Sequence, residues 1–117
     1  MAPFERLADE DFCYLTTVGR KTGKLHTIEI WFARENGKLY ILSGGGESAD
    51  WVGNLRKTRA VRVRIGSRSV AAKARALTAS EEGGLARRLL DEKYMGWSEG
   101  KRLSSWARNA LPVAIEF

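Results

Sequence analysis

The 117-residue chain has few of the residues that build disulfide frameworks and metal centres. It contains one cysteine, Cys13, and one histidine, His26. A single cysteine excludes an intrachain disulfide framework, and one histidine with one distant cysteine cannot complete a zinc site. We therefore expect no bound metal, and the low cysteine content suits a reducing cytoplasmic compartment.

Long apolar runs and the common catalytic signatures are also missing. No segment approaches the roughly 20 apolar residues that span a bilayer, and no stretch has the pattern of a signal peptide. Neither a P-loop nor the pattern G-x-G-x-x-G occurs, and no serine lies in a nucleophile elbow. We expect a cytoplasmic protein without an integral membrane segment, and we assign no catalytic side chain.

Positive charge is in excess, because 20 lysines and arginines outnumber 14 aspartates and glutamates, for a net charge of +6. The basic residues are dispersed, and neither zinc-finger spacing nor the RNP aromatic pattern accompanies them. A solvated surface explains most of them. An anionic small molecule is the sharper alternative for the clusters at 20–24 and 56–59, and a nucleic-acid partner is the least favoured.

Hydrophobic periodicity indicates one domain over residues 1–117 with a mainly β, α+β fold. Alternation predicts strands at 11–18, 25–32, 39–42, 60–65, 69–77 and 111–117. Helices are expected at 47–57 with Ser48 as N-cap, from a capping box at Thr78–Glu81 to Tyr94, and at 103–109, after a helical lead-in over 1–10. These elements suit a small antiparallel split β-barrel. Because so narrow a barrel is filled by its own side chains, a ligand must lie outside it or between subunits.

The turn that follows the first predicted strand is the strongest candidate for a binding site. It runs Gly19-Arg20-Lys21-Thr22-Gly23-Lys24, with two glycines around two adjacent cations and a hydroxyl. Glycine allows close backbone approach, and cations with exposed N–H groups can hold a phosphate or carboxylate. A charged hairpin turn without a ligand remains the alternative.

A chain without its own acid, base and metal can still catalyse a reaction if a bound cofactor carries the chemistry. Ser43-Gly44-Gly45 would let a flat ring approach the backbone, and Trp31 and Trp51 offer aromatic faces. Asn54 can both donate and accept hydrogen bonds.

Three motifs in order resemble the deazaflavin (F420)-dependent nitroreductase family. They are Thr16-Thr17-x-Gly19-Arg20-Lys21-Thr22-Gly23, Ser43-x-Gly45-Gly46 and Trp51-x-x-Asn54-Leu55. The resemblance is strong over residues 15–66 and looser over 93–117. It implies an FMN-reductase-like split β-barrel, a homodimer, and hydride transfer from coenzyme F420 to a small-molecule acceptor such as a quinone, nitroaromatic or enone. An FMN-binding reductase and a non-catalytic ligand-binding protein stay open.

The resemblance also implies roles for individual residues. Tyr94 and Trp97 are expected at the acceptor. The cofactor-binding set is Arg20, Lys21, Thr22, Gly23, His26, Ile28, Ile30, Trp31, Ser43, Gly44, Gly45, Trp51, Asn54 and Leu55. The chain departs from the family pattern at His26, where arginine is frequent, and at Glu29, where proline is frequent.

Overall fold

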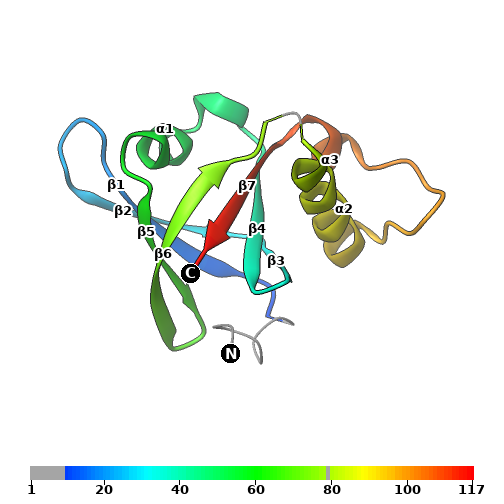
Figure 1. The fold of residues 1–117 in the computed structure, drawn as a ribbon, viewed down its shortest axis with the longest axis horizontal. Helices are drawn as coiled ribbons and strands as arrows, with labels where there is room; N and C mark the ends of the chain where they lie inside the picture. Colours follow the sequence, from blue (N-terminus) through cyan, green and yellow to red (C-terminus); the bar gives the residue numbers. More distant parts are fainter. Residues whose placement is uncertain (1–9, 79) are drawn as a thin grey trace.

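In the described part of the chain, seven strands pair antiparallel in one curled sheet with the order β2-β1-β5-β6-β7-β4-β3 (Figure 1). The computed structural model describes residues 10–78 and 80–117, so the helical lead-in expected over 1–10 falls, apart from Glu10, outside the described residues. The sequence predicts a mainly β, α+β fold with an antiparallel split β-barrel, and the curled antiparallel sheet, a half-barrel with helices, confirms this fold class. The strands are β1 (Cys13–Val18), β2 (Leu25–Ile30), β3 (Ala33–Glu35), β4 (Lys38–Ser43), β5 (Ala60–Ile65), β6 (Arg68–Ala76) and β7 (Leu111–Glu116).

Alternation of apolar and polar residues sets the two faces of the strands. In β5, Val61, Val63 and Ile65 are buried while Arg62 and Arg64 are exposed, as the period of two requires. The buried residues belong to a core inside the curl, built mainly from valine, isoleucine and leucine side chains.

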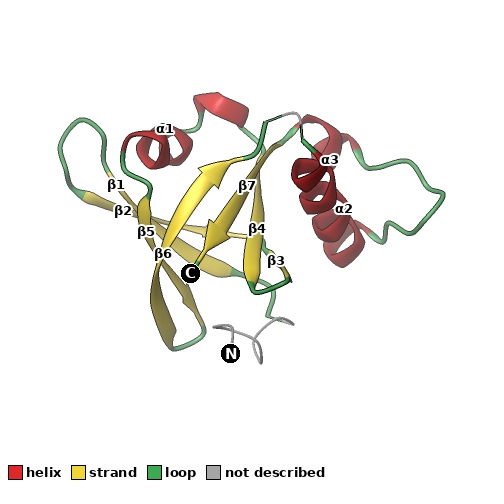
Figure 2. Ribbon diagram, viewed as in Figure 1, coloured by secondary structure: helices red, strands yellow, loops and turns green. Residues whose placement is uncertain are grey.

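A second core lies between the sheet and the helices α2 (Glu81–Met95) and α3 (Ser105–Asn109). Figure 2 shows these two helices on one side of the sheet and α1 (Asp50–Lys57) on the other, near the turn between β1 and β2. No helix in the described residues is long and apolar enough to span a bilayer.

Two predicted helix starts are wrong. The first predicted helix is split, because Gly46–Ser48 form the 3-10 turn η2 and Ala49 is extended before α1 begins. The Ser48 hydroxyl donates to the Gly45 carbonyl at 2.7 Å and caps nothing. In α2 the N-cap is Ser80, whose Oγ accepts from the Gly83 N–H at 3.0 Å, so the helix begins later than a capping box at Thr78 would place it.

The strand expected over 25–32 ends at Ile30 and is followed by the short strand β3. The reason is a contact from a distant part of the chain. Phe32 is fully buried, and both its N–H and its carbonyl lie within hydrogen-bond distance of the Tyr94 hydroxyl in α2. These contacts hold residues 31–32 out of the ladder. As a result β2 and β3, the two ends of the sheet order, are joined by residues 31–32 alone.

Candidate functional site

A groove of about 540 Å³ lies between the β1–β2 turn, strand β2 and helix α1. The structure brings seven of the predicted cofactor-binding residues to its walls: Arg20, Lys21, Thr22, His26, Ile28, Trp51 and Asn54. Gly19, Lys24, Thr27 and Asp50 complete the lining. The turn and the strand that directly follows it therefore meet helix α1, from a later part of the chain, at one site.

Glycine is required at the base of the turn. The Gly19 N–H donates to the Lys24 carbonyl at 2.7 Å, and the Gly23 N–H donates to the Gly19 carbonyl at 2.8 Å. A Cβ at position 19 would lie 2.9 Å from His26 Nε2 and 3.0 Å from the Lys24 carbonyl oxygen. The absence of a side chain thus lets the turn close and lets the His26 ring lie against it.

Asn54 joins the turn to helix α1. Its Oδ1 accepts from the Arg20 backbone N–H at 3.1 Å and from Arg20 Nη1 at 3.0 Å. Its Nδ2 donates to Thr17 Oγ1 at 3.1 Å, and both Asn54 and Thr17 are buried. We call these three bonds the Asn54 clamp. Because a buried amide must be satisfied, the clamp fixes the turn relative to the helix.

Arg20 is therefore already engaged. Its Nη2 pairs with Asp50 Oδ1 at 3.1 Å, and its Nη1 also donates to the Asp50 carbonyl. Its own carbonyl accepts from Lys57 Nζ at 2.9 Å. Gly53 makes room for the guanidinium, since a Cβ there would lie 3.0 Å from Arg20 Cζ. The structure gives Arg20 an anchoring role that the sequence did not indicate, and its contact with a cofactor stays a prediction.

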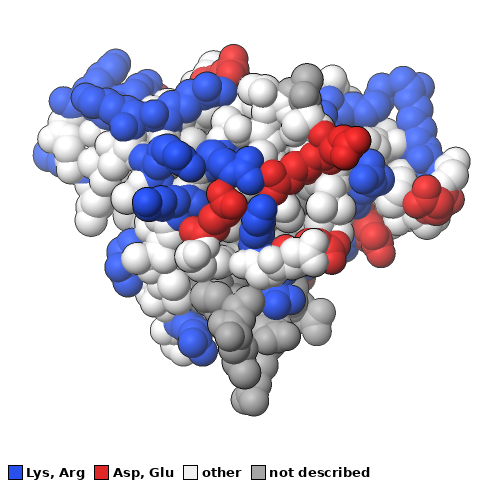
Figure 3. Space-filling view, in the orientation of Figure 1, with Lys and Arg blue, Asp and Glu red and all other residues white. Residues whose placement is uncertain are grey.

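Two other cations of the turn carry unbalanced charge. Lys21 and Lys24 are exposed, and among the described residues neither side chain forms an ion pair or hydrogen bond. Asp50, already paired with Arg20, is the one acidic residue in the described lining. In Figure 3 lysine and arginine side chains gather at the upper left, where Figure 1 places this turn and α1. The described lining of the groove thus carries more positive than negative charge.

The remaining predicted cofactor residues do not line this groove. Gly23 shapes the turn with a φ of 76°, and Leu55 is buried in the core. Ser43 is buried at the end of β4, where its Oγ donates to the Gly46 carbonyl at 2.9 Å; Gly44 and Gly45 follow it in the loop before η2.

Ile30 and Trp31 line a second hollow of about 310 Å³, which we call the aromatic recess. Its other lining residues are Phe12, Glu29, Leu42 and Trp106. Trp106 lies on α3, and nothing in its local sequence marked it as a candidate.

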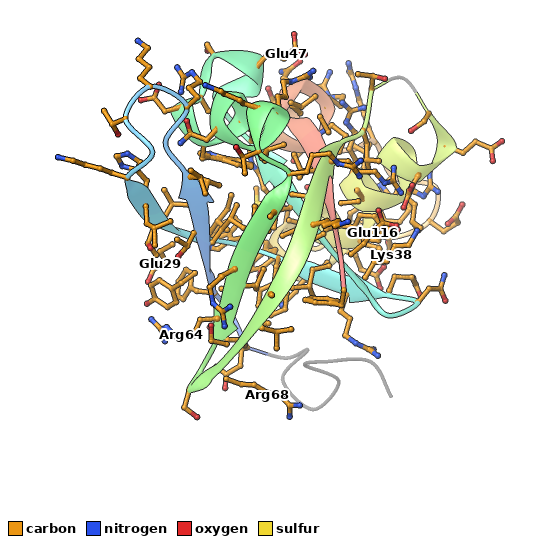
Figure 4. All side chains as sticks on the ribbon, turned by 60° about the vertical axis from the view of Figure 1, so that its left-hand side comes forward. Glu29, Lys38, Glu47, Arg64, Arg68 and Glu116 are labelled. Carbon is orange, nitrogen blue, oxygen red and sulfur yellow. The ribbon has the colours of Figure 1, made fainter. Side chains whose placement is uncertain are left out.

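The Glu29 side chain does not line the groove beside the cationic turn. Its carboxylate accepts a hydrogen bond at 2.6 Å from the hydroxyl of Tyr14, its neighbour on the paired strand β1. The Arg64 guanidinium lies 4.1 Å from the centre of the Tyr14 ring. Figure 4 shows Glu29 and Arg64 on one side of the molecule, away from Lys38 and Glu116. Hydrogen bonding to Glu29 raises the pKa of Tyr14 above its ordinary value.

The two residues predicted at the acceptor differ in their surroundings. Tyr94 stacks on Trp31 with ring centres 4.4 Å apart and planes at 3°, and its hydroxyl also lies 2.8 Å from the Asp11 carbonyl. Burial raises the pKa of Tyr94 to about 12, so it is neutral at physiological pH. Trp97 lies after α2 and donates from Nε1 to the Lys101 carbonyl at 2.8 Å. Neither lines the groove or the recess.

Solved structures with known descriptions share this architecture. An F420-H2 dependent reductase (FDR-A) is 26% identical, with a TM-score of 0.68 over 91% of this chain and 93% of that one. A protein described as a domain-swapped dimer is 28% identical, with a TM-score of 0.68 over 92% and 80% of the two chains. The heme storage protein HutZ of Vibrio cholerae, at 13% identity, has a TM-score of 0.74 over 97% and 86%, which shows the fold alone.

Comparison with curated proteins gave no match. A family model, in contrast, matches residues 4–116, nearly the whole chain, and its description is F420H(2)-dependent quinone reductase. This agrees with the three motifs in the turn, the loop after β4 and helix α1. The chain belongs to the F420H2-dependent quinone reductase family.

Proposed function

We propose that this protein is an oxidoreductase that uses reduced coenzyme F420 to reduce a small electron-poor acceptor, such as a quinone, a nitroaromatic or an enone. Family membership and the 26% identical F420-H2 dependent reductase support the cofactor. The observation that carries the proposal is the groove itself, which joins an aromatic face to two ammonium groups that have no ion-pair partner among the described residues.

The residues present fit an anionic cofactor with a flat ring. The groove volume of about 540 Å³ lies within the usual range for small-molecule sites. Lys21 and Lys24 supply charge for a phosphate and an acidic tail, while Trp51 and Ile28 supply apolar contact for a ring system. Among the described residues strand β2 pairs with β1 alone, which leaves its other backbone edge beside the groove without a strand partner in that part of the chain.

The side chains of this chain bind and orient rather than react. When bound, reduced F420 supplies a hydride, which with one proton from solvent converts a quinone to a hydroquinone. The Asn54 clamp fixes the turn, Lys21 and Lys24 hold the anionic end, and Trp51 lines the ring end. A direct role for Arg20, Thr22, Gly23, His26 and the Ser43–Gly45 loop is part of the same proposal.

The test is a pair of fluorescence titrations of the purified protein with F420 and with FMN. We expect F420 to bind more tightly, and the Lys21→Ala/Lys24→Ala variant to weaken F420 binding about 10- to 100-fold, from charge-assisted bonds of about 1.5–3 kcal/mol discounted for exposure. The matched control, Arg62→Ala/Arg68→Ala, removes the same charge from exposed positions outside the groove and should change affinity less than threefold.

The other outcomes identify the rival functions. Tighter binding of FMN would favour an FMN-dependent reductase. Binding of F420 with no menadione-dependent oxidation of F420H2 would favour a protein that carries or stores the cofactor. Equal losses in the two double variants would show a diffuse effect of net charge and would contradict the assignment of the turn.

We further propose a homodimer, which the resemblance implies and the domain-swapped dimer among the related structures supports. Light scattering after size-exclusion chromatography measures the mass directly. A mass near 13.1 kDa would contradict the proposal.

A further inference from the structure

The aromatic recess and the proposed cofactor groove are lined by residues two positions apart on β2. Ile28 lines the groove and Ile30 lines the recess, and both point to the same face of the strand. Two residues along a strand are separated by about 7 Å. A molecule in the recess would therefore lie beside one in the groove, as hydride transfer between two ligands requires.

Two indole rings give the recess a defined shape. Trp31 and Trp106 meet edge to face, with ring centres 5.4 Å apart and planes at 87°. Trp31 is 37% exposed, while Tyr94 covers it by stacking and is itself hydrogen-bonded to the backbone of Phe32. The Trp31 ring is therefore held in a fixed orientation but still has exposed surface.

The chemistry of the lining selects against a charged ligand. Phe12, Ile30, Leu42 and the two tryptophans are apolar or aromatic, and Glu29 is the one ionisable residue in the described lining. Glu29 already accepts from Tyr14. With no cation in that lining, the recess suits a flat, uncharged aromatic molecule and disfavours an anion.

We propose that the aromatic recess is the acceptor site, that it takes a planar uncharged ring such as a naphthoquinone, and that Trp31 and Trp106 contact this ring. Tyr94 is then a positioning residue that acts through Trp31. This inference rests on the proposed function for its redox role, and it gives the acceptor a place different from the Trp97 segment that the family resemblance implies.

The direct test needs no turnover. The four tryptophan indole N–H signals are assigned by triple-resonance NMR, and menadione is titrated into the protein alone and with oxidised F420. We expect the Trp31 and Trp106 signals to shift in a saturable way while the Trp97 signal stays in place. Shifts at Trp97 instead, or no saturable shift at any indole, would overturn the proposal.

Kinetics with F420H2 give the second test. We expect Trp106→Ala to raise the KM for menadione at least tenfold while the Kd for F420 stays within twofold. Met95→Ala, an equally apolar truncation at an exposed position outside both hollows, should leave both values unchanged. A melting curve and the milder Trp106→Phe variant separate loss of the contact from loss of the fold.

The two proposals can fail separately. If F420 binds and is turned over but neither Trp106 variant changes the KM for menadione, the recess is not the acceptor site and the proposed function stands. If menadione shifts the two indoles but F420 does not bind, the recess is a ligand site and the proposed function is wrong.

Discussion

Replacing Asn54 with alanine should both destabilise the protein and loosen the β1–β2 turn that we propose binds the cofactor. The substitution removes the Asn54 clamp: two bonds to Arg20, at 3.1 and 3.0 Å, and one to Thr17 at 3.1 Å. Thr17 is 1% exposed, so its hydroxyl would lose a partner that water cannot easily replace. No other side chain of α1 bonds to both β1 and the turn in the described residues.

The magnitude follows from the three bonds. A neutral hydrogen bond contributes about 0.5–1.5 kcal/mol and one to a charged group about 1.5–3 kcal/mol. Arg20 is one-third exposed and keeps Asp50, so part of its loss is recovered from solvent and from that pair. We expect the free energy of unfolding to fall by about 2–4 kcal/mol, which for a domain of this size corresponds to roughly 8–16 °C in melting temperature.

The assay is urea unfolding followed by far-UV circular dichroism, with F420 titration of the folded variant. Asn109→Ala is the control, because that asparagine is exposed and makes one side-chain bond, to Ser105 at 3.2 Å. It should cost less than about 0.5 kcal/mol. A double variant of Asn54 and Arg20 should cost clearly less than the sum of the two single variants. A loss below about 1 kcal/mol for Asn54→Ala, or strict additivity, would refute the clamp.

Two further predictions concern titration and reactivity. Hydrogen bonds from Arg75, Tyr40 and Lys38 lower the pKa of Glu82 from its ordinary value near 4.5 to about 2. A carboxyl whose pKa is lower in the folded than in the unfolded state stabilises the fold at pH values above the unfolded-state pKa. In denaturation curves, the free energy of unfolding of the wild type should therefore exceed that of Glu82→Gln at pH 7, and this difference should disappear between pH 4.5 and about 2. A difference that grows on acidification would contradict this prediction. Burial raises the pKa of the Cys13 thiol to about 12, so an aromatic disulfide reagent at neutral pH should label it only when denaturant unfolds the chain, and rapid labelling of the native protein would contradict its burial.

The sequence predicts most of the fold where local pattern and tertiary packing agree. The alternation in β5 places Val63 inside and Arg62 outside because one period decides both propensity and burial. The local pattern fails at Phe32. Alternation continues there from β2, but the backbone N–H and carbonyl of Phe32 lie within hydrogen-bond distance of the Tyr94 hydroxyl, 62 residues away in the chain. Ser48 shows the same limit of local pattern at a helix start. Its hydroxyl donates to the backbone carbonyl of Gly45, three residues earlier, and does not cap α1.

Part of the site was predictable for a similar reason. A glycine-bounded turn and a Trp51-x-x-Asn54 helix each carry a local signature, and the fold places them on two walls of one groove. Trp106 has no such signature. It enters the aromatic recess only because α3 packs against α2 and places one indole across another, a contact between residues 75 positions apart in the chain.

The division of work among the cations of the turn also depends on tertiary contacts. Arginine presents donors in a planar fork, and Arg20 uses that fork on Asn54 and Asp50 together. Lysine carries a compact charge on a flexible stem, and Lys21 and Lys24 keep that charge beside the groove. The sequence shows three positive charges within five residues, which suggests one shared task. The structure separates them: Arg20 is partly buried against α1 and fixes the turn, whereas Lys21 and Lys24 stay exposed, where the proposed function places the anionic end of the cofactor.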